Sequence, residues 1–150
     1  MRTVVILLFL LSVSFSAKSE NFEGGVFEGD YVLVRAGGTK SCYEETTIQY
    51  DRRTRSLWLT DVKSGDFNVY PNINRGIIKA DEWSTDSGKT FYTEASGNRV
   101  RSLKIWPEAF GRMYEERLLY LSPDKKVLTH ENNYRSENLG TYHSCRWNRK

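Results

Sequence analysis

The two cysteines, Cys42 and Cys145, constrain the fold of this chain more than any other feature, because its 150 residues contain no others. An even cysteine count in an exported chain favours a single disulfide. Such a bridge would hold the last predicted strand, Thr141–Arg149, beside the start of the domain. Closing a loop of about 100 residues is worth roughly 4–5 kcal/mol in the chain-entropy account. Two free thiols or a pair of metal ligands are the alternatives.

The N-terminus has the pattern of an export signal. Arg2 is followed by the apolar run Val4–Leu11, and small residues suited to cleavage come next. The run is shorter than the roughly 20 apolar residues that a spanning helix needs. We therefore predict a signal peptide over residues 1–19, one domain over residues 20–150, and a secreted or periplasmic protein without a membrane span. A retained anchor helix or a buried first helix is the alternative.

Alternating apolar residues predict short strands along most of the chain. The first examples are Tyr31–Arg35, Cys42–Tyr50 and Ser56–Asp61, where Leu57 and Leu59 face one side and Trp58 the other. Lys89–Glu94 with Arg99–Trp106, and Leu118–Leu121 with Val127–His130, flank turn-forming residues and indicate two further hairpins. Pro107–Arg117 begins with a proline and carries glutamates, which favours one short helix, or a loop because Gly111 weakens the helix. Residues 132–140 are polar and indicate a loop.

About eight short strands with little helix favour a β-sandwich or a β-barrel. A disulfide from the second segment to the last suits a closed meander, in which the first and last strands are neighbours. We predict an all-β domain, a single antiparallel up-and-down barrel closed by the disulfide.

Gly29-Asp30-Tyr31 at the first strand and Cys145-Arg146-Trp147 in the last resemble the lipocalins, the best known of the calycin barrels. In that family a Gly-x-Trp opening places a tryptophan at the barrel floor, under a basic side chain from the last strand. This chain has Tyr31 in place of the tryptophan. The resemblance implies a calycin-like barrel that binds a small ligand.

A second resemblance is to small, disulfide-bonded bacterial barrels that inhibit lysozymes. Their inhibitory loops centre on serine and glycine, for which Ser87-Gly88-Lys89 and Ser96-Gly97-Asn98 are crude matches. This resemblance implies a protein-interaction module or enzyme inhibitor that acts through exposed loops.

The sequence contains no motif that indicates an enzyme, a cofactor or a metal site. His130 and His143 are candidates for acid–base chemistry with Lys104 or Arg146, but nothing in their spacing brings them together. The pair His143 and Cys145 would be half of a metal site, except that the disulfide uses the sulfur. A net charge of +3 is too small to indicate nucleic acid as a partner.

We therefore expect a non-enzymatic protein that holds a small apolar or amphipathic ligand in its barrel. The inward positions expected to contact this ligand are Phe67, Phe91, Ile105, Leu119, Leu121 and Tyr142. The alternative is recognition of a protein partner by the outer surface. There Trp58 and the basic turn residues Arg52, Arg53 and Arg55 are the candidates.

Overall fold

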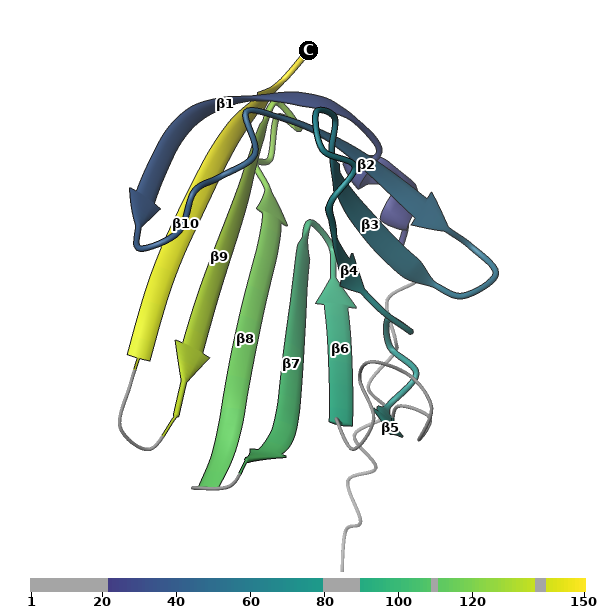
Figure 1. Ribbon diagram of the computed structural model, residues 1–150. Helices are drawn as coiled ribbons and strands as arrows, with labels where there is room; N and C mark the ends of the chain where they lie inside the picture. Colours follow the sequence, from purple (N-terminus) through teal and green to yellow (C-terminus); the bar gives the residue numbers. More distant parts are fainter. Residues whose placement is uncertain (1–21, 80–89, 109–110, 137–139) are drawn as a thin grey trace, which may run out of the picture.

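One antiparallel sheet of ten strands curls into a nearly closed barrel in the computed structural model of the chain (Figure 1). The structure describes residues 22–79, 90–108, 111–136 and 140–150, so the predicted signal peptide lies outside the described residues. In chain order the elements are the 3₁₀ turn η1 (Gly24–Phe27), β1 (Gly29–Gly38), β2 (Glu45–Asp51), β3 (Ser56–Asp61), β4 (Phe67–Tyr70), β5 (Ile77–Lys79), β6 (Thr90–Ser96), β7 (Arg99–Glu108), β8 (Gly111–Leu121), β9 (Val127–Arg135) and β10 (Gly140–Arg149).

The strand order makes the sheet an up-and-down meander. Neighbours run β4-β3-β2-β1-β10-β9-β8-β7-β6-β5, so every connection joins adjacent strands except the one from β4 to β5. The first and last strands pair from Tyr31 opposite Arg149 to Gly38 opposite His143. The predicted all-β antiparallel barrel, with its first and last strands side by side, is confirmed.

The disulfide between Cys42 and Cys145 is also confirmed, with the two sulfur atoms 1.97 Å apart. Cys42 lies in the connection between β1 and β2, and the bridge fastens this connection to β10. Beside it, the indole N–H of Trp147 donates to the carbonyl of Tyr43 at 2.8 Å. The bridge therefore reinforces the middle of the sheet, where β1 and β10 already pair.

The opening of the barrel lies elsewhere, between the edge strands β4 and β5. The link that joins them crosses toward β6, where the backbone N–H of Asn74 donates to Thr93 at 2.9 Å. The Asn74 side chain exchanges two further hydrogen bonds with the backbone of Ala95, at 2.7 and 3.0 Å. These contacts hold the seam without a continuous strand ladder.

The helix predicted at Pro107–Arg117 is wrong. Its described residues, 107–108 and 111–117, form the end of β7 and the first part of β8. Likewise β9 continues to Arg135, into the segment expected to be a loop. Among the described residues the one helical element is η1, and none of the described helices is long and apolar enough to cross a membrane.

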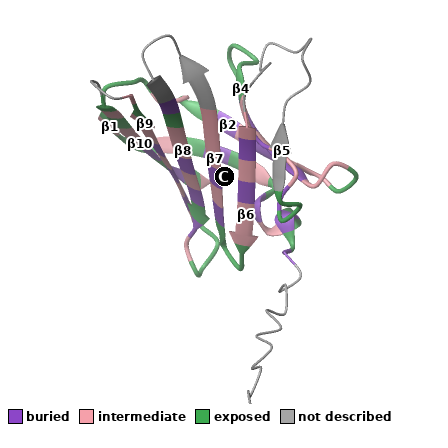
Figure 2. Cartoon of the chain, turned by 90° about the horizontal axis from the view of Figure 1, so that it is seen from below, coloured by how far each residue is buried: buried purple, intermediate pink, exposed green. Residues whose placement is uncertain are grey.

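Burial alternates along the strands, as the period of two requires (Figure 2). Leu57 and Leu59 are each 1% exposed, whereas Trp58 between them points outward and packs on the exposed ring of Phe67, with the centroids 5.0 Å apart. The orientation predicted for Trp58 is therefore confirmed.

Candidate functional site

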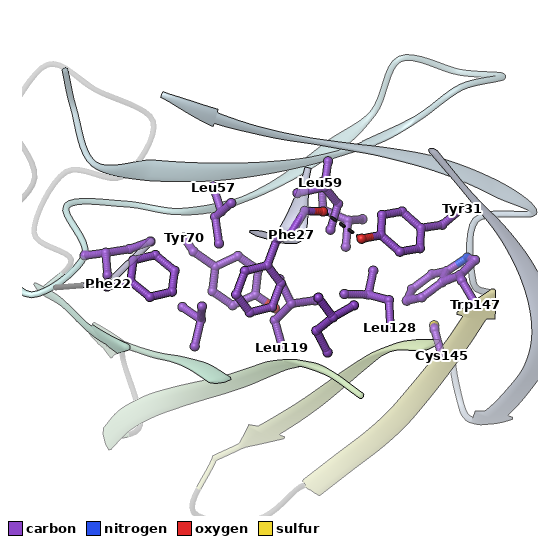
Figure 3. Close-up of a cluster of buried hydrophobic side chains, with 14 residues drawn as sticks. Phe22, Phe27, Tyr31, Leu57, Leu59, Tyr70, Leu119, Leu128, Cys145 and Trp147 are labelled. Carbon is purple, nitrogen blue, oxygen red and sulfur yellow. Dashed lines mark hydrogen bonds between the residues drawn. The ribbon is translucent and has the colours of Figure 1, made fainter. Parts of the chain in front are cut away.

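The interior of the barrel is divided into an apolar floor and a polar chamber. The floor is a cluster of buried side chains that contact one another (Figure 3). Its fully buried members include Phe27, Tyr31, Leu57, Leu59, Tyr70, Leu119, Leu121, Leu128 and Trp147. Apolar burial on this scale stabilises the fold, and the packed side chains fill this end of the barrel.

Arg149 closes the floor. Its guanidinium lies 5.2 Å from the centre of the Tyr31 ring and donates to the Tyr31 hydroxyl at 2.6 Å. The same group donates to the carbonyl of Val26 at 2.7 Å, and the Tyr31 hydroxyl donates to the carbonyl of Phe27, also at 2.7 Å. A basic side chain from the last strand thus covers the ring that follows Gly29, as the resemblance implies. It comes from Arg149, whereas Arg146 is exposed.

The chamber lies on the other side of the floor. It is a cavity of about 220 Å³ whose wall is polar and apolar in nearly equal parts. Its polar side chains include Lys40, Tyr43, Asn68, Glu115, His130, Asn132 and His143. Leu59 and Trp147 belong both to the floor and to the wall of the cavity.

Strand register explains how these residues meet. On β8 and β9, Arg117 stands opposite Asn132, and Leu119 stands opposite His130. On β10, His143 stands opposite the same Asn132. Because side chains two residues apart share a face of the sheet, His130, Asn132 and His143 all face inward with Arg117.

The two histidines lie next to each other, with their ring centroids 5.6 Å apart and their planes nearly perpendicular. Burial, followed by the positive charge of Arg117, lowers the pKa of His130 from 6.5 to about 3. Burial and the nearby Lys40 lower the pKa of His143 as well, while Glu115 acts in the opposite direction. Both imidazoles are therefore neutral near pH 7.

The donor atoms of His130, His143 and Cys145 all lie within 4.8 Å of one another, the one group of this kind among the described residues. The disulfide removes the Cys145 thiolate from any ligand set, because metals bind the thiolate form. Two imidazoles remain, with the guanidinium of Arg117 close enough to depress one pKa. This environment does not favour a cation.

Arg117 and Glu115 form the charged part of the interior. Arg117 is 6% exposed, and its Nη2 lies 3.6 Å from a Glu115 oxygen, while Asn132 donates to the other oxygen at 2.7 Å. The Nη1 of Arg117 extends across the barrel to β4 and donates to the carbonyl of Val69 at 3.3 Å. Arg117 thus links β8 to the edge strand β4.

The six positions expected to line an apolar ligand site do not come together. Phe67 and Tyr142 point outward and are 57% and 45% exposed, so their predicted inward orientation is wrong. Ile105 pairs with Tyr114 on the outward face, so the same correction applies to it. Leu119 and Leu121 are buried in the floor, and Phe91 is buried beneath the Lys104 ammonium at 5.4 Å. Because side chains alternate between the two faces of a strand, an alternation pattern assigned one residue out of step places each side chain on the wrong face.

The surface candidates are separated along β3. Trp58 and Phe67 form an outward aromatic pair. Arg52 and Arg53 are exposed in the turn before β3, while Arg55 is partly buried and its carbonyl accepts from the backbone N–H of Ile73.

A wider depression of about 1180 Å³ lies outside the barrel along β6 and β7. Its charged residues bind each other, since Arg101 contacts Glu94 at 3.3 Å and Glu116 at 2.6 Å. Tyr92 donates to Glu94 at 2.9 Å. These pairs stabilise the outer face and leave the inner chamber as the better candidate site.

Neither a protein-family model nor a curated protein sequence matches the chain. The candidate site therefore depends on geometry. Sequence reasoning singled out His130 and His143 but missed Glu115, Arg117 and Asn132. The alternation of Met113, Glu115, Arg117 and Leu119 was the available signal, and two charged residues in it obscured the inward face.

Proposed function

We propose that this protein is an exported, non-catalytic binding protein that holds one small, largely polar molecule in the chamber of its barrel. The observation that carries the proposal is the cavity of about 220 Å³ with polar groups on its wall. Sites for drug-sized ligands usually measure about 300–1,000 Å³. The expected ligand is smaller than these molecules.

The distribution of apolar side chains supports a polar ligand over an apolar one. The large apolar residues pack against each other in the floor, so they offer little free surface to a ligand. The groups left around the cavity include Asn68, Asn132 and the two imidazoles. Hydrogen bonding to such groups gives orientation and specificity.

The state of the polar groups supports binding without catalysis. An acid–base catalyst works best with a pKa near the working pH, whereas His130 has a pKa of about 3. Glu115 is engaged by Asn132 and Arg117. Lys104 lies over Phe91, and Arg146 is exposed outside the barrel, so neither is placed beside the histidines for the acid–base chemistry considered above.

The disulfide supports an environment outside the cytoplasm, because such bridges persist in oxidising compartments. Together with the predicted signal peptide, it leads us to propose a secreted or periplasmic location.

Native mass spectrometry of protein purified from its own source tests the proposal. We expect a bound small molecule that is lost on denaturation. His143→Phe should reduce its occupancy by narrowing the chamber, whereas Tyr142→Phe changes the neighbouring outward residue and should leave it bound. A bare native mass, or equal occupancy in both variants, would contradict the proposal.

A second candidate function is recognition of a protein partner by the outer face of β3 and β4. The favouring observation is the contact of Trp58 with Phe67, a large apolar ring that is 57% exposed. A photoreactive residue at position 67 should form one defined protein adduct in the source medium. The absence of an adduct would argue against this function.

A further inference from the structure

Four side chains that can bind a metal ion meet in the wall of the chamber. The cavity is lined by Cys42, His130, His143 and Cys145. Ligand atoms of His130, His143 and Cys145 lie within 4.8 Å of one another, and Cys42 is bonded to Cys145. Two cysteines with two histidines are a common ligand set of tetrahedral zinc sites. The disulfide is therefore the one feature of this cluster that a zinc site would not have.

Strand pairing positions the cluster. Cys145 on β10 stands opposite His130 on β9, where the Cβ atoms of facing residues are roughly 4.5–5.5 Å apart. His143 lies two residues before Cys145 on the same strand and therefore on the same face. Cys42 belongs to the connection between β1 and β2, to whose backbone the indole N–H of Trp147 donates at 2.8 Å. These contacts do not require the disulfide, so the four residues stay close together when it is reduced.

His130 has a nitrogen that lacks a partner. Its Nε2 makes no hydrogen bond within the described part of the protein, although the residue is only 3% exposed. Buried polar atoms normally have partners, because leaving one without a partner is costly. Neutral imidazole binds metal ions through either ring nitrogen. A metal ion bound at this position would supply the missing partner.

Charge explains why the site depends on the redox state of the cysteines. In the oxidised protein the sulfur atoms carry no charge, and the nearby cations Arg117 and Lys40 disfavour a metal ion. Reduction followed by loss of two protons gives two thiolates, whose negative charges cancel those of one Zn²⁺. The zinc form therefore adds no net charge to a chamber in which Glu115 already balances part of the positive charge.

We propose that reduction of the disulfide creates a zinc site in the wall of the chamber. Its four ligands are Cys42, His130, His143 and Cys145. A dithiol reductant gives two electrons and two protons to the two sulfur atoms, which breaks the S–S bond and converts the reductant into its own disulfide. The two thiols then release their protons to solvent as they bind Zn²⁺. This site goes beyond the proposed function and does not rest on it.

Zinc titration of the reduced protein tests the site. The protein is reduced with dithiothreitol, freed of the reductant under argon and titrated with Zn²⁺ at pH 7 in competition with a chromophoric chelator. We expect one zinc ion per chain with a dissociation constant below about 100 nM, and at least roughly 100-fold weaker binding to the oxidised protein. Co²⁺ should give the visible absorption of tetrahedral cobalt with thiolate ligands, whereas Ca²⁺ should not bind, because it prefers oxygen ligands.

Two variants test the histidine ligands. His130→Gln and His143→Gln should each weaken zinc binding to the reduced protein by at least roughly tenfold, since even residues that only orient a ligand are worth 10–100-fold. Tyr142→Phe is the matched control, because Tyr142 neighbours His143 and points outward, and it should bind zinc as the wild type does. Unchanged affinity in both histidine variants would show that the thiols bind the metal without them, and would overturn the proposal.

Measurements of folding distinguish a built site from binding to an unfolded chain. If the reduced protein stays folded, zinc should raise its Tm and leave that of the oxidised protein unchanged. If reduction unfolds it, zinc should restore the circular dichroism of the sheet. A reduced chain that zinc neither stabilises nor refolds, or one that binds zinc equally well in urea, would overturn the proposal.

Reoxidation provides the converse test. Oxidised glutathione accepts two electrons from the two thiolates, so we expect one Zn²⁺ to be released for each disulfide that forms again. Zinc that stays bound after the disulfide has formed would overturn the assignment of the cysteines. None of these results bears on the native mass of the oxidised protein, which tests the proposed function separately.

Discussion

Protonation of His130 should make the stability of the protein fall steeply below pH 6.5. In the unfolded chain this histidine takes up its proton near pH 6.5, whereas in the folded protein its pKa is about 3. Between these values the unfolded state binds more protons, so acid favours unfolding. At pH 5, about 1.5 pH units below the ordinary value, the lost stability is about 2 kcal/mol, from 1.36 kcal/mol per unit.

The other groups with a shifted pKa do not oppose the loss of stability between pH 7 and pH 5. Hydrogen bonds, first of all from side chains, lower the pKa values of Asp51, Asp61 and Asp124 below 3.8, so their contributions are lost at more acidic pH. The lowered pKa of His143 acts in the same direction as that of His130. Burial raises the pKa of Tyr70, so its hydroxyl stays protonated between pH 5 and 7.

Urea denaturation followed by tryptophan fluorescence at pH 7 and pH 5 measures the effect. His130→Gln should lower the stability at pH 7 but remove most of the pH dependence. His143→Gln should remove only a smaller part of it. An unchanged drop in His130→Gln, or a folded-state pKa of His130 near 6.5 by NMR, would refute the reasoning.

Three substitutions test the rest of the fold by thermal and urea denaturation. Cys145→Ser should destabilise the protein by up to roughly 4–5 kcal/mol; unchanged stability would contradict a structural bridge. Arg149→Met should cost about 2–3 kcal/mol, because it removes charged hydrogen bonds at the floor, while exposed Arg146→Met should stay within about 0.5 kcal/mol; equal effects would contradict the floor arrangement. Gly24→Ala would place a methyl group against the Tyr50 ring and should cost about 1–3 kcal/mol; a neutral effect would contradict that packing.

The general architecture could be predicted because its signals are local or covalent. Leu57 and Leu59 alternate with Trp58, and the paired cysteines bring the first and last strands together. The position of the opening could not be predicted, because it depends on strand order. Cys42 lies after β1, so the disulfide reinforces the β1–β10 pair and the gap falls between β4 and β5.

The site escaped prediction for the same reason that the helix was predicted wrongly. Glu115 and Arg117 occupy inward positions on β8, where sequence patterns lead one to expect apolar residues. Their charges made the segment resemble a helix with a polar face. A polar barrel interior thus removes the contrast between faces from which strands are recognised.

The contact of His130 with His143 depends on register alone. The two residues are diagonal neighbours because Cys145 stands opposite His130 and Asn132 stands opposite His143. The spacing of the histidines in the sequence indicates neither this pairing nor the depth of His130. The burial that lowers its pKa is a property of the closed barrel.

Comparison of the native and denatured masses of protein purified from its own source tests the central claim most directly. We predict that the native mass exceeds the denatured mass by one small molecule, and that His143→Phe lowers the share of the protein that carries it. Equal native and denatured masses would contradict the account.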